Sequence, residues 1–98
     1  MPPTFEYRDQ TVTDWARLDA TDKDRFRKAR DELVADLESG NSPRPGLRVK
    51  GVQGAPGIFE MTWAPDGRAT FEFGAEIKLG QRHIKWRRIG THSIFNRP

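Results

Sequence analysis

Arginine and lysine are the most frequent residues in this sequence that could take part in chemistry. Residues 44–98 contain ten Lys or Arg against four Asp or Glu, a net charge of +6, whereas residues 1–43 carry a net charge of −3. Fixed positive charge binds phosphate groups and stabilises the negative charge that develops on a phosphate during its cleavage. The candidates for such contacts are Arg44, Arg48, Lys50, Arg68, Lys85, Arg87 and Arg88. A solvated surface that binds no ligand would carry the same charge, so both interpretations stay open.

His92 is the candidate for proton transfer, because histidine side chains exchange protons near neutral pH. Cleavage of RNA requires no nucleophile from the protein, since the 2′-hydroxyl of RNA can attack the adjacent phosphate once a base accepts its proton. An aromatic side chain such as Trp63 or Phe95 could stack on a nucleobase, although the pattern favours a core position for Trp63. A lone histidine is structural about as often as it is catalytic, so both roles stay open for His92.

Several classes of site are excluded by what the sequence lacks. There is no cysteine, which excludes disulfides, cysteine-based zinc sites and thiol nucleophiles. We find no glycine-rich phosphate loop, no metal-binding histidine pair and no nucleophile elbow. We therefore expect neither a metal nor a cofactor. Glu60 and Glu72 are expected to pair with Arg68 or Lys85 across neighbouring strands rather than to act as catalytic carboxylates.

The length and hydropathy of the chain limit its size and location. Ninety-eight residues correspond to one small domain, which we assign to residues 1–98. No apolar run is long enough to span a membrane, so we expect no membrane partner. The N-terminus does not resemble a secretory signal, and we therefore expect a cytoplasmic protein.

Apolar residues in the N-terminal half recur at the spacing of an α-helix. The residues that share this period are Phe26, Ala29, Leu33, Val34 and Leu37. They predict a helix of about seventeen residues, capped by Thr21 and ended by residues 39–41. A shorter helix capped by Thr13 or Asp14 is expected before it, and residues 5–12 are expected to hold a short strand.

After residue 46 apolar residues alternate with polar ones, a period of two that is typical of strands. We predict strands at residues 47–52, 58–63, 69–73 and 83–89, a tight turn at 64–68 and a longer connection at 74–82. The apolar face of these strands consists of Phe59, Met61, Trp63, Phe71, Phe73, Ile84 and Trp86. The other face is polar and largely basic, and a bulge is expected near Arg87, where the alternation breaks. The predicted fold is α+β: two N-terminal helices pack on one face of a small twisted antiparallel sheet.

This order of segments resembles the RelE/ParE superfamily of bacterial toxins over roughly residues 5–95. The resemblance rests on residues 47–54, 58–61, 68–71 and 88–95, and the most specific part is the run from Ile89 through Gly90, Thr91 and His92 to Phe95. It implies a RelE-like fold and a toxin that cleaves messenger RNA in the ribosomal decoding site by attack of the 2′-hydroxyl. It also implies a cognate antitoxin as partner, besides mRNA on the ribosome.

The resemblance assigns roles to individual residues. Arg48 and Lys50 match the basic pair before the first central strand, Arg68 matches the arginine that opens the strand after the tight turn, and His92 matches the basic or titratable C-terminal residue. Phe95 lies near the position where many members have a functional tyrosine, and it has no hydroxyl group. Two alternatives stay open, a ParE-like poison of DNA gyrase and an inert module that binds RNA or an acidic protein.

Overall fold

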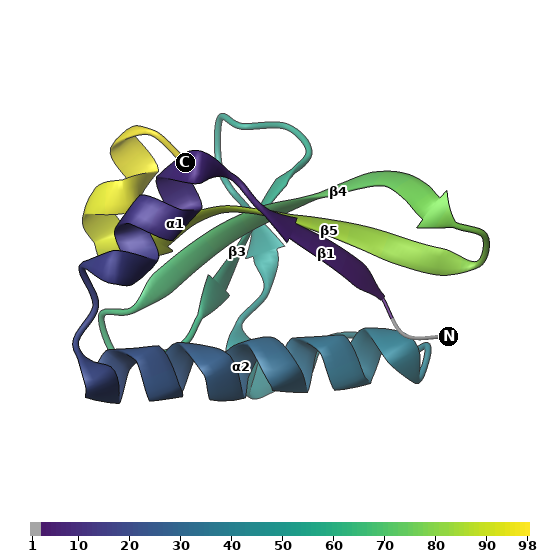
Figure 1. The fold of residues 1–98 in the computed structure, drawn as a ribbon, viewed down its shortest axis with the longest axis horizontal. Helices are drawn as coiled ribbons and strands as arrows, with labels where there is room; N and C mark the ends of the chain where they lie inside the picture. The colour runs from purple at the N-terminus through teal and green to yellow at the C-terminus, as the bar shows by residue number, and fades with distance from the viewer. Residues whose placement is uncertain (1–2) are drawn as a thin grey trace.

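One long helix and a five-stranded sheet make up most of the fold. The structure is a computed structural model that describes residues 3–98. The helices are α1 (Asp9–Ala16), α2 (Ala20–Glu38) and two short 3-10 helices, η1 (Pro45–Leu47) and η2 (His92–Asn96). The strands are β1 (Thr4–Tyr7), β2 (Lys50–Gly51), β3 (Ile58–Thr62), β4 (Arg68–Lys78) and β5 (Gln81–Gly90). In Figure 1, α2 runs beneath the sheet, while α1 and η2 lie at the opposite end of the molecule from the turn between β4 and β5.

The sheet has the strand order β1-β5-β4-β3-β2. Its pairs are antiparallel except that the edge strand β1 runs parallel to β5. This arrangement confirms the predicted α+β fold, and the parallel edge strand is its one departure from an antiparallel sheet. No helix within the described residues combines the length and the apolar character that crossing a membrane requires.

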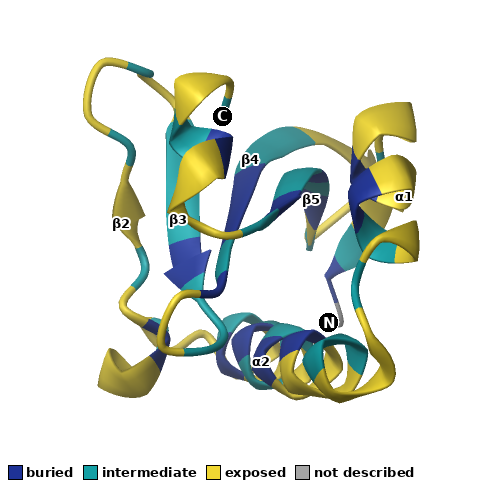
Figure 2. Cartoon of the chain, turned by 90° about the vertical axis from the view of Figure 1, so that its left-hand side faces the viewer, coloured by how far each residue is buried: buried dark blue, intermediate teal, exposed yellow. Residues whose placement is uncertain are grey.

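The core lies between α2 and one face of the sheet, as the two periods predict. Phe26 and Leu33 of α2 and Met61, Ile84 and Trp86 of the strands are each fully buried. The predicted inner residues Phe59, Trp63 and Phe73 are partly buried and pack against this cluster. Figure 2 shows α2 with its buried residues toward the strands and its exposed residues toward solvent. The alternation of apolar residues therefore identified the inner face correctly.

The predicted bulge is present on β5. Thr70 pairs with Arg88 whereas Phe71 pairs with Trp86, so that Arg87 has no partner of its own on β4. Because of this extra residue, both arginines point away from the core while Ile89 turns back into it.

The outer face of the sheet is less exposed than its polar sequence indicates. Thr70 is fully buried, and its hydroxyl donates a hydrogen bond to the Pro98 carbonyl oxygen at 2.9 Å. His83 is also buried, and its ring contacts the Thr4 hydroxyl at 2.7 Å and a Glu6 carboxylate oxygen at 2.8 Å. His83 thus holds the edge strand β1 against β5, and the C-terminal residues cover part of the outer face.

Both helices begin earlier than predicted. Helix α1 starts at Asp9, so Thr13 and Asp14 lie inside the helix rather than at its cap. The cap of α2 is Asp19, whose carboxylate accepts a hydrogen bond from the N–H of Asp22 at 2.8 Å, and the prediction of Thr21 is wrong. Both residue types can cap a helix, but a carboxylate also interacts favourably with the helix dipole.

Two loop predictions are also corrected. The strand expected at residues 47–52 is reduced to β2, because η1 precedes it and Arg48 adopts a left-handed conformation with φ of 49° that extended backbone cannot contain. The longer connection expected at residues 74–82 is a hairpin, in which β4 and β5 continue to a turn that contains Gly80 with φ of 78°. The two strands stay paired beyond a second register shift, between Gly74 and Lys78, as far as the pair Lys78–Gln81, although the apolar alternation of these exposed ends is weak.

Helix α1 is fastened to β5 by a buried carboxylate. Asp14 accepts hydrogen bonds from the Arg88 guanidinium at 2.7 Å and from the N–H of Ile89 at 3.0 Å. Burial by itself would raise the pKa of Asp14, but hydrogen bonds from Arg88, from the Ile89 N–H and from Gln10 outweigh it and hold the pKa below its ordinary value. The ionised form therefore stabilises the fold at neutral pH.

We expect acid to weaken the protein through this group. Since the folded pKa of Asp14 is depressed, its contribution is present above the unfolded pKa of about 3.9 and is lost as pH falls through the folded value. Replacing Asp14 with Asn should lower stability at pH 7 by about 1.5–3 kcal/mol and remove part of the loss in acid. Urea unfolding at several pH values measures both effects, and an unchanged pH dependence in Asp14→Asn would contradict this role.

Candidate functional site

Arg68 is held at the start of β4 by the turn that precedes it. Its Nη1 atom donates to the carbonyl oxygens of Ala64, Pro65 and Gly67 at 3.2, 3.3 and 2.9 Å. Carbonyl oxygens orient the guanidinium without neutralising it. No carboxylate among residues 3–98 forms an ion pair with Arg68. Arg68 is thus a fixed side chain with an unneutralised positive charge.

The cross-strand ion pairs expected for Arg68 are not formed. Glu60 lies 3.8 Å from the Lys50 ammonium, and Glu72 pairs with Arg87 at 3.1 Å. The strand register explains this difference, because Arg68 faces Thr62 rather than either glutamate.

His92 forms a hydrogen bond with a carboxylate of the same turn. Its Nδ1 atom lies 2.7 Å from Oδ1 of Asp66, and the two side chains are 58% and 70% exposed. An ionised carboxylate can only accept a hydrogen bond, so Nδ1 is the donor and Nε2 of the neutral ring is left as a proton acceptor. The ring of Phe95 packs edge-on against the imidazole, with a centroid separation of 5.8 Å. His92 is therefore oriented on two sides and remains accessible to a ligand.

The turn between β3 and β4 positions both groups. Gly67 donates to the Ala64 carbonyl oxygen at 3.0 Å, and Trp63 donates to the Gly67 carbonyl oxygen at 3.1 Å. The Trp63 indole covers Gly67 so closely that a Cβ there would come within 2.6 Å of the ring. This turn carries Asp66 and the carbonyl oxygens that bind Arg68, so one rigid segment links His92 to the free arginine.

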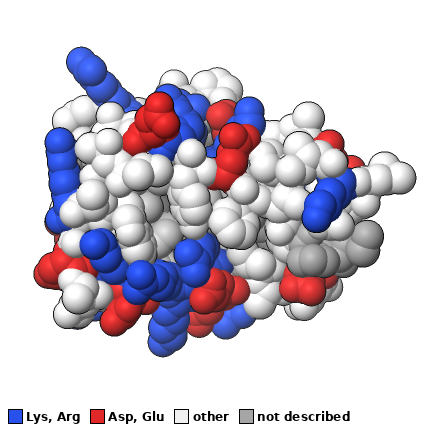
Figure 3. Space-filling view, in the orientation of Figure 1, with Lys and Arg blue, Asp and Glu red and all other residues white. Residues whose placement is uncertain are grey.

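A basic groove begins at the same turn. It has a volume of about 580 Å³ and lies between α2, η1 and the turn. The five basic residues that line it are Arg25, Lys28, Arg44, Arg48 and Arg68, against one acid, Glu32. Figure 3 shows, from another side, that Lys and Arg also gather over α2 along the lower edge of the molecule, with Asp and Glu between them. We call this hollow the basic groove; its charge suits a phosphate backbone.

Arg44 is part of the groove wall but is already paired. Its guanidinium binds Asp36 at 2.8 Å and Glu32 at 3.1 Å, and its N–H also donates to Asp36 at 2.8 Å. These hydrogen bonds hold the pKa of Asp36 below its usual range, although desolvation opposes them. Arg44 therefore fixes the loop after α2. Arg48, in the same loop, is exposed and forms no ion pair with a carboxylate of residues 3–98.

The remaining predicted basic residues lie away from the groove. Lys50 lines a separate hollow beside Phe59, and Lys85 is on the outer face of β5 opposite Glu72. Arg87 and Arg88 line a third hollow near the C-terminus, where carboxylates and main-chain oxygens already bind both. The structure thus brings Arg44, Arg48 and Arg68 together, places His92 beside the same turn, and separates the other four. Their predicted roles in RNA binding stay predictions.

Residues 3–98 contain no group of three or more His, Asp or Glu side chains placed to hold a metal ion. The prediction that neither a metal nor a cofactor is needed stays a prediction.

Comparison with known proteins identifies the fold. No family model matches the sequence, and no curated protein matches it. A chain of the E. coli DinJ–YafQ toxin–antitoxin complex superimposes with a TM-score of 0.69 at 18% identity, covering 95% of this chain and 96% of that one. The archaeal RelE–RelB complex from Pyrococcus horikoshii OT3 gives a TM-score of 0.64 at 18% identity, covering 93% of this chain and 96% of that one. The YoeB/ParE toxin from Agrobacterium tumefaciens gives a TM-score of 0.67 at 10% identity, covering 91% of this chain and 98% of that one. This chain has the fold of the RelE-like toxins.

The structure also identifies candidate site residues that the sequence did not indicate. Arg25 and Lys28 belong to the wall of the basic groove, and Asp66 is the partner of His92. A signal for the first two was present, because Arg25, Lys28 and Glu32 recur at the spacing of one helix face. Nothing in the sequence distinguished Asp66 from an ordinary turn residue.

Proposed function

We propose that this protein is the toxin of a toxin–antitoxin pair and that it cleaves messenger RNA on the ribosome. The observation that carries this proposal is the single turn that holds an unneutralised arginine, Arg68, and a histidine–carboxylate pair, His92 and Asp66, beside a basic groove. The RelE-like fold supports it.

The arrangement suits attack by the 2′-hydroxyl of RNA. His92 Nε2 accepts the 2′-hydroxyl proton while the 2′ oxygen forms a bond to phosphorus and the bond to the 5′ oxygen breaks. The protonated ring then returns its proton to the departing 5′ oxygen, leaving a 2′,3′-cyclic phosphate and a 5′-hydroxyl. Arg68 stabilises the charge that develops on the phosphate, and Asp66 holds the imidazole in the tautomer that leaves Nε2 unprotonated.

The other predicted residues extend this site. Arg48 and the groove residues hold phosphates that flank the cleaved bond, and Phe95 offers an aromatic face beside His92. Lys50, Arg87 and Arg88 are assigned to more distant contacts with RNA, whereas Lys85, which lies opposite Glu72 on β5, is expected to contribute little to cleavage. We also propose a cytoplasmic location. We propose a cognate antitoxin as partner because solved structures with this fold were obtained as DinJ–YafQ and RelE–RelB complexes.

Induced expression in bacteria tests the proposed function. Growth should stop, and primer extension should show new 5′ ends within messenger RNA while chromosomal DNA stays intact. Arrested growth with broken DNA and intact mRNA would favour a gyrase poison instead. Normal growth with abundant soluble protein would exclude both toxin functions and favour the remaining alternative, an inert module that binds RNA or an acidic protein.

Replacing Arg68 with alanine should lower the cleavage rate by about 10²–10³-fold, because it removes a preorganised charge donor. Stability should change little, since the carbonyl oxygens that it contacts lie in a surface turn that water can solvate. The measurement is cleavage of a ribosome-bound mRNA, combined with a melting curve. Lys85→Ala is the matched control and should retain nearly full activity. Equal activity of Arg68→Ala and Lys85→Ala would exclude Arg68 from the site.

A further inference from the structure

A small hollow lies beside the turn at residues 63–67, which positions the proposed catalytic groups. It has a volume of about 300 Å³, at the lower end of the usual range for ligand pockets. Its walls are this turn, Thr91, which precedes His92, and two residues near the start of α2, Asp22 and Arg25. We call this space the turn hollow.

The turn hollow adjoins the basic groove. Arg25 and residues 63–65 line both spaces. Asp66 also lines the turn hollow, and it is the partner of His92. An RNA strand whose phosphates follow the basic groove therefore has room for one base in the turn hollow, next to the proposed site of cleavage.

Asp22 and Arg25 provide the polar groups that α2 contributes to the turn hollow. Nη1 of Arg25 donates to Oδ1 of Asp22 at 3.4 Å, a long contact, and no other hydrogen bond to either side chain is found among residues 3–98. The two side chains are 55% and 35% exposed, so a ligand can reach both. A carboxylate has two acceptor oxygens, and a guanidinium has only donors. The pair therefore presents a donor beside two acceptors.

This pattern complements the Watson–Crick edge of guanine. Guanine offers the acceptor O6, followed by two adjacent donors, N1–H and the 2-amino group. Adenine and cytosine each offer a single donor group on this edge, and uracil offers one N–H between two acceptors. Among the four bases, only guanine can donate to both oxygens of Asp22 while it accepts from Arg25.

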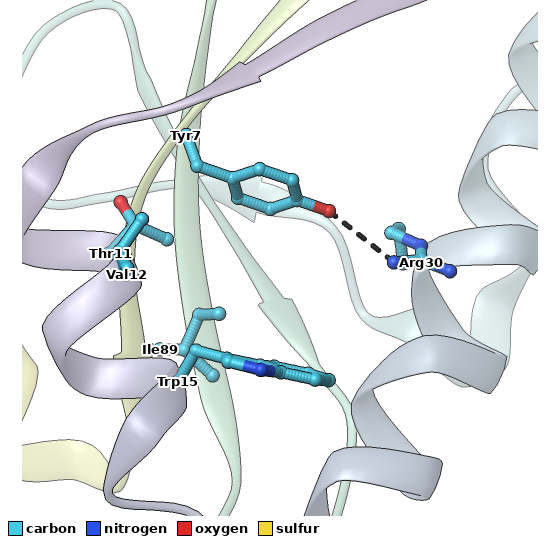
Figure 4. A pocket seen from close by; sticks show the side chains of 6 residues that line it. All are labelled: Tyr7, Thr11, Val12, Trp15, Arg30 and Ile89. Carbon is cyan, nitrogen blue, oxygen red and sulfur yellow. Dashed lines mark hydrogen bonds between the residues drawn. The ribbon is translucent and has the colours of Figure 1, made fainter.

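Another hollow of about 300 Å³ lacks this pattern. It lies between the Tyr7 ring and the Trp15 indole, as Figure 4 shows, and no carboxylate of the described residues lines it. Its charged residue, Arg30, donates to the Tyr7 hydroxyl at 3.3 Å. A guanine base therefore has no acceptor pair to bind there, and Trp15 provides a control signal for a ligand that enters the turn hollow.

We propose that the turn hollow binds a guanine base of the RNA substrate, with Asp22 bound to N1–H and the 2-amino group and Arg25 bound to O6. Trp63 and Pro65 provide apolar walls that a flat base contacts. Asp22 is then a specificity-determining residue, and cleavage occurs next to guanine. The identity of the ligand as RNA rests on the proposed function.

An NMR titration with an RNA that cannot be cleaved tests the guanine contact. The probe is a five-nucleotide RNA with guanine at the centre and uracil elsewhere, and a 2′-O-methyl group on every ribose removes the nucleophile. The indole N–H signal of Trp63 and the amide signal of Thr91 should move, while the indole signal of Trp15 stays in place.

Matched RNAs with another central base measure the preference. Adenine at the centre should weaken binding by about 5–150-fold, the usual range for losing a bidentate contact to a base edge. Hypoxanthine, which differs from guanine only by the missing 2-amino group, should give an intermediate affinity. These comparisons use the unaltered protein and do not depend on the folding of any variant.

Two substitutions on α2 separate the guanine contact from a change of charge. Asp22→Asn removes one of the two acceptor oxygens and should bind the guanine and adenine RNAs with nearly equal affinity. Asp24→Asn makes the same change at a side chain that is 77% exposed, pairs with Arg27 and lies outside the turn hollow, so it should keep the preference. In induced cells, new 5′ ends in mRNA should lie next to guanine for the parent protein and for Asp24→Asn but not for Asp22→Asn.

Three results would overturn the proposal. They are unmoved Trp63 and Thr91 signals at millimolar RNA, equal affinity for the guanine RNA and either matched RNA, or a guanine preference that survives in Asp22→Asn. Failure of the proposed function is distinct from these. Guanine binding without cleavage of mRNA would keep the base site and remove the nuclease assignment, whereas cleavage with no enrichment of guanine would do the reverse.

Discussion

Replacing His92 with alanine is expected to slow the proposed mRNA cleavage by about 10²–10⁴-fold, the usual cost of removing a general acid or base. The imidazole is exposed, and its Nδ1 atom is bound to Asp66, which leaves Nε2 for the proposed proton transfer. Because the side chain contributes little to the core, the melting temperature should change by only a few degrees. Single-turnover cleavage on programmed ribosomes measures the rate, and expression in growing cells measures the relief of toxicity.

The chain contains its own control for this experiment. His83 is the other histidine, and it is buried between Thr4 and Glu6, where it holds β1 in place. His83→Gln should therefore lower stability and leave the cleavage rate of the folded protein close to normal. Asp66→Ala should give an intermediate loss of rate, since it removes only the group that orients His92. Full toxicity of His92→Ala would exclude His92 as the proton carrier.

Replacing Phe71 with alanine is expected to destabilise the protein by about 3–5 kcal/mol, the typical cost of removing a buried phenylalanine. Phe71 is 1% exposed, and its ring contacts Phe59, Phe73 and Trp86 at centroid separations of 5.7, 5.7 and 5.4 Å. Small domains have total stabilities of about 5–15 kcal/mol, so this loss should remove a large part of the stability and lower the melting temperature strongly.

Thermal melting tests this prediction directly. For a domain of this size each kcal/mol corresponds to about 4–8 °C in the melting temperature. Phe5→Ala removes a phenylalanine that is 49% exposed on the edge strand and should have a much smaller effect. An unchanged melting temperature in Phe71→Ala would contradict the packing of α2 on this face of the sheet.

The sequence by itself determined the elements whose apolar residues repeat with a clear period. The helical spacing of Phe26, Ala29 and Leu33 located α2, and the alternation around Phe71 and Trp86 located the inner face of the sheet. Both follow from local geometry, because a residue three or four positions away on a helix, or two positions away on a strand, always lies on the same side. The bulge at Arg87 was predictable for the same reason, since the alternation visibly fails there.

Only the tertiary structure decided which basic side chains are paired with a carboxylate and which are not. Arg88 looked like a ligand for RNA, but it is bound by Asp14, which lies 74 positions away in the chain. Arg68 looked like the partner of a glutamate and instead binds carbonyl oxygens. His92 gains Asp66 because η2 folds back over the turn after β3. Such pairs depend on strand register and on the path of loops, which set distances of a few ångströms between residues that are remote in the sequence, and no local period encodes them.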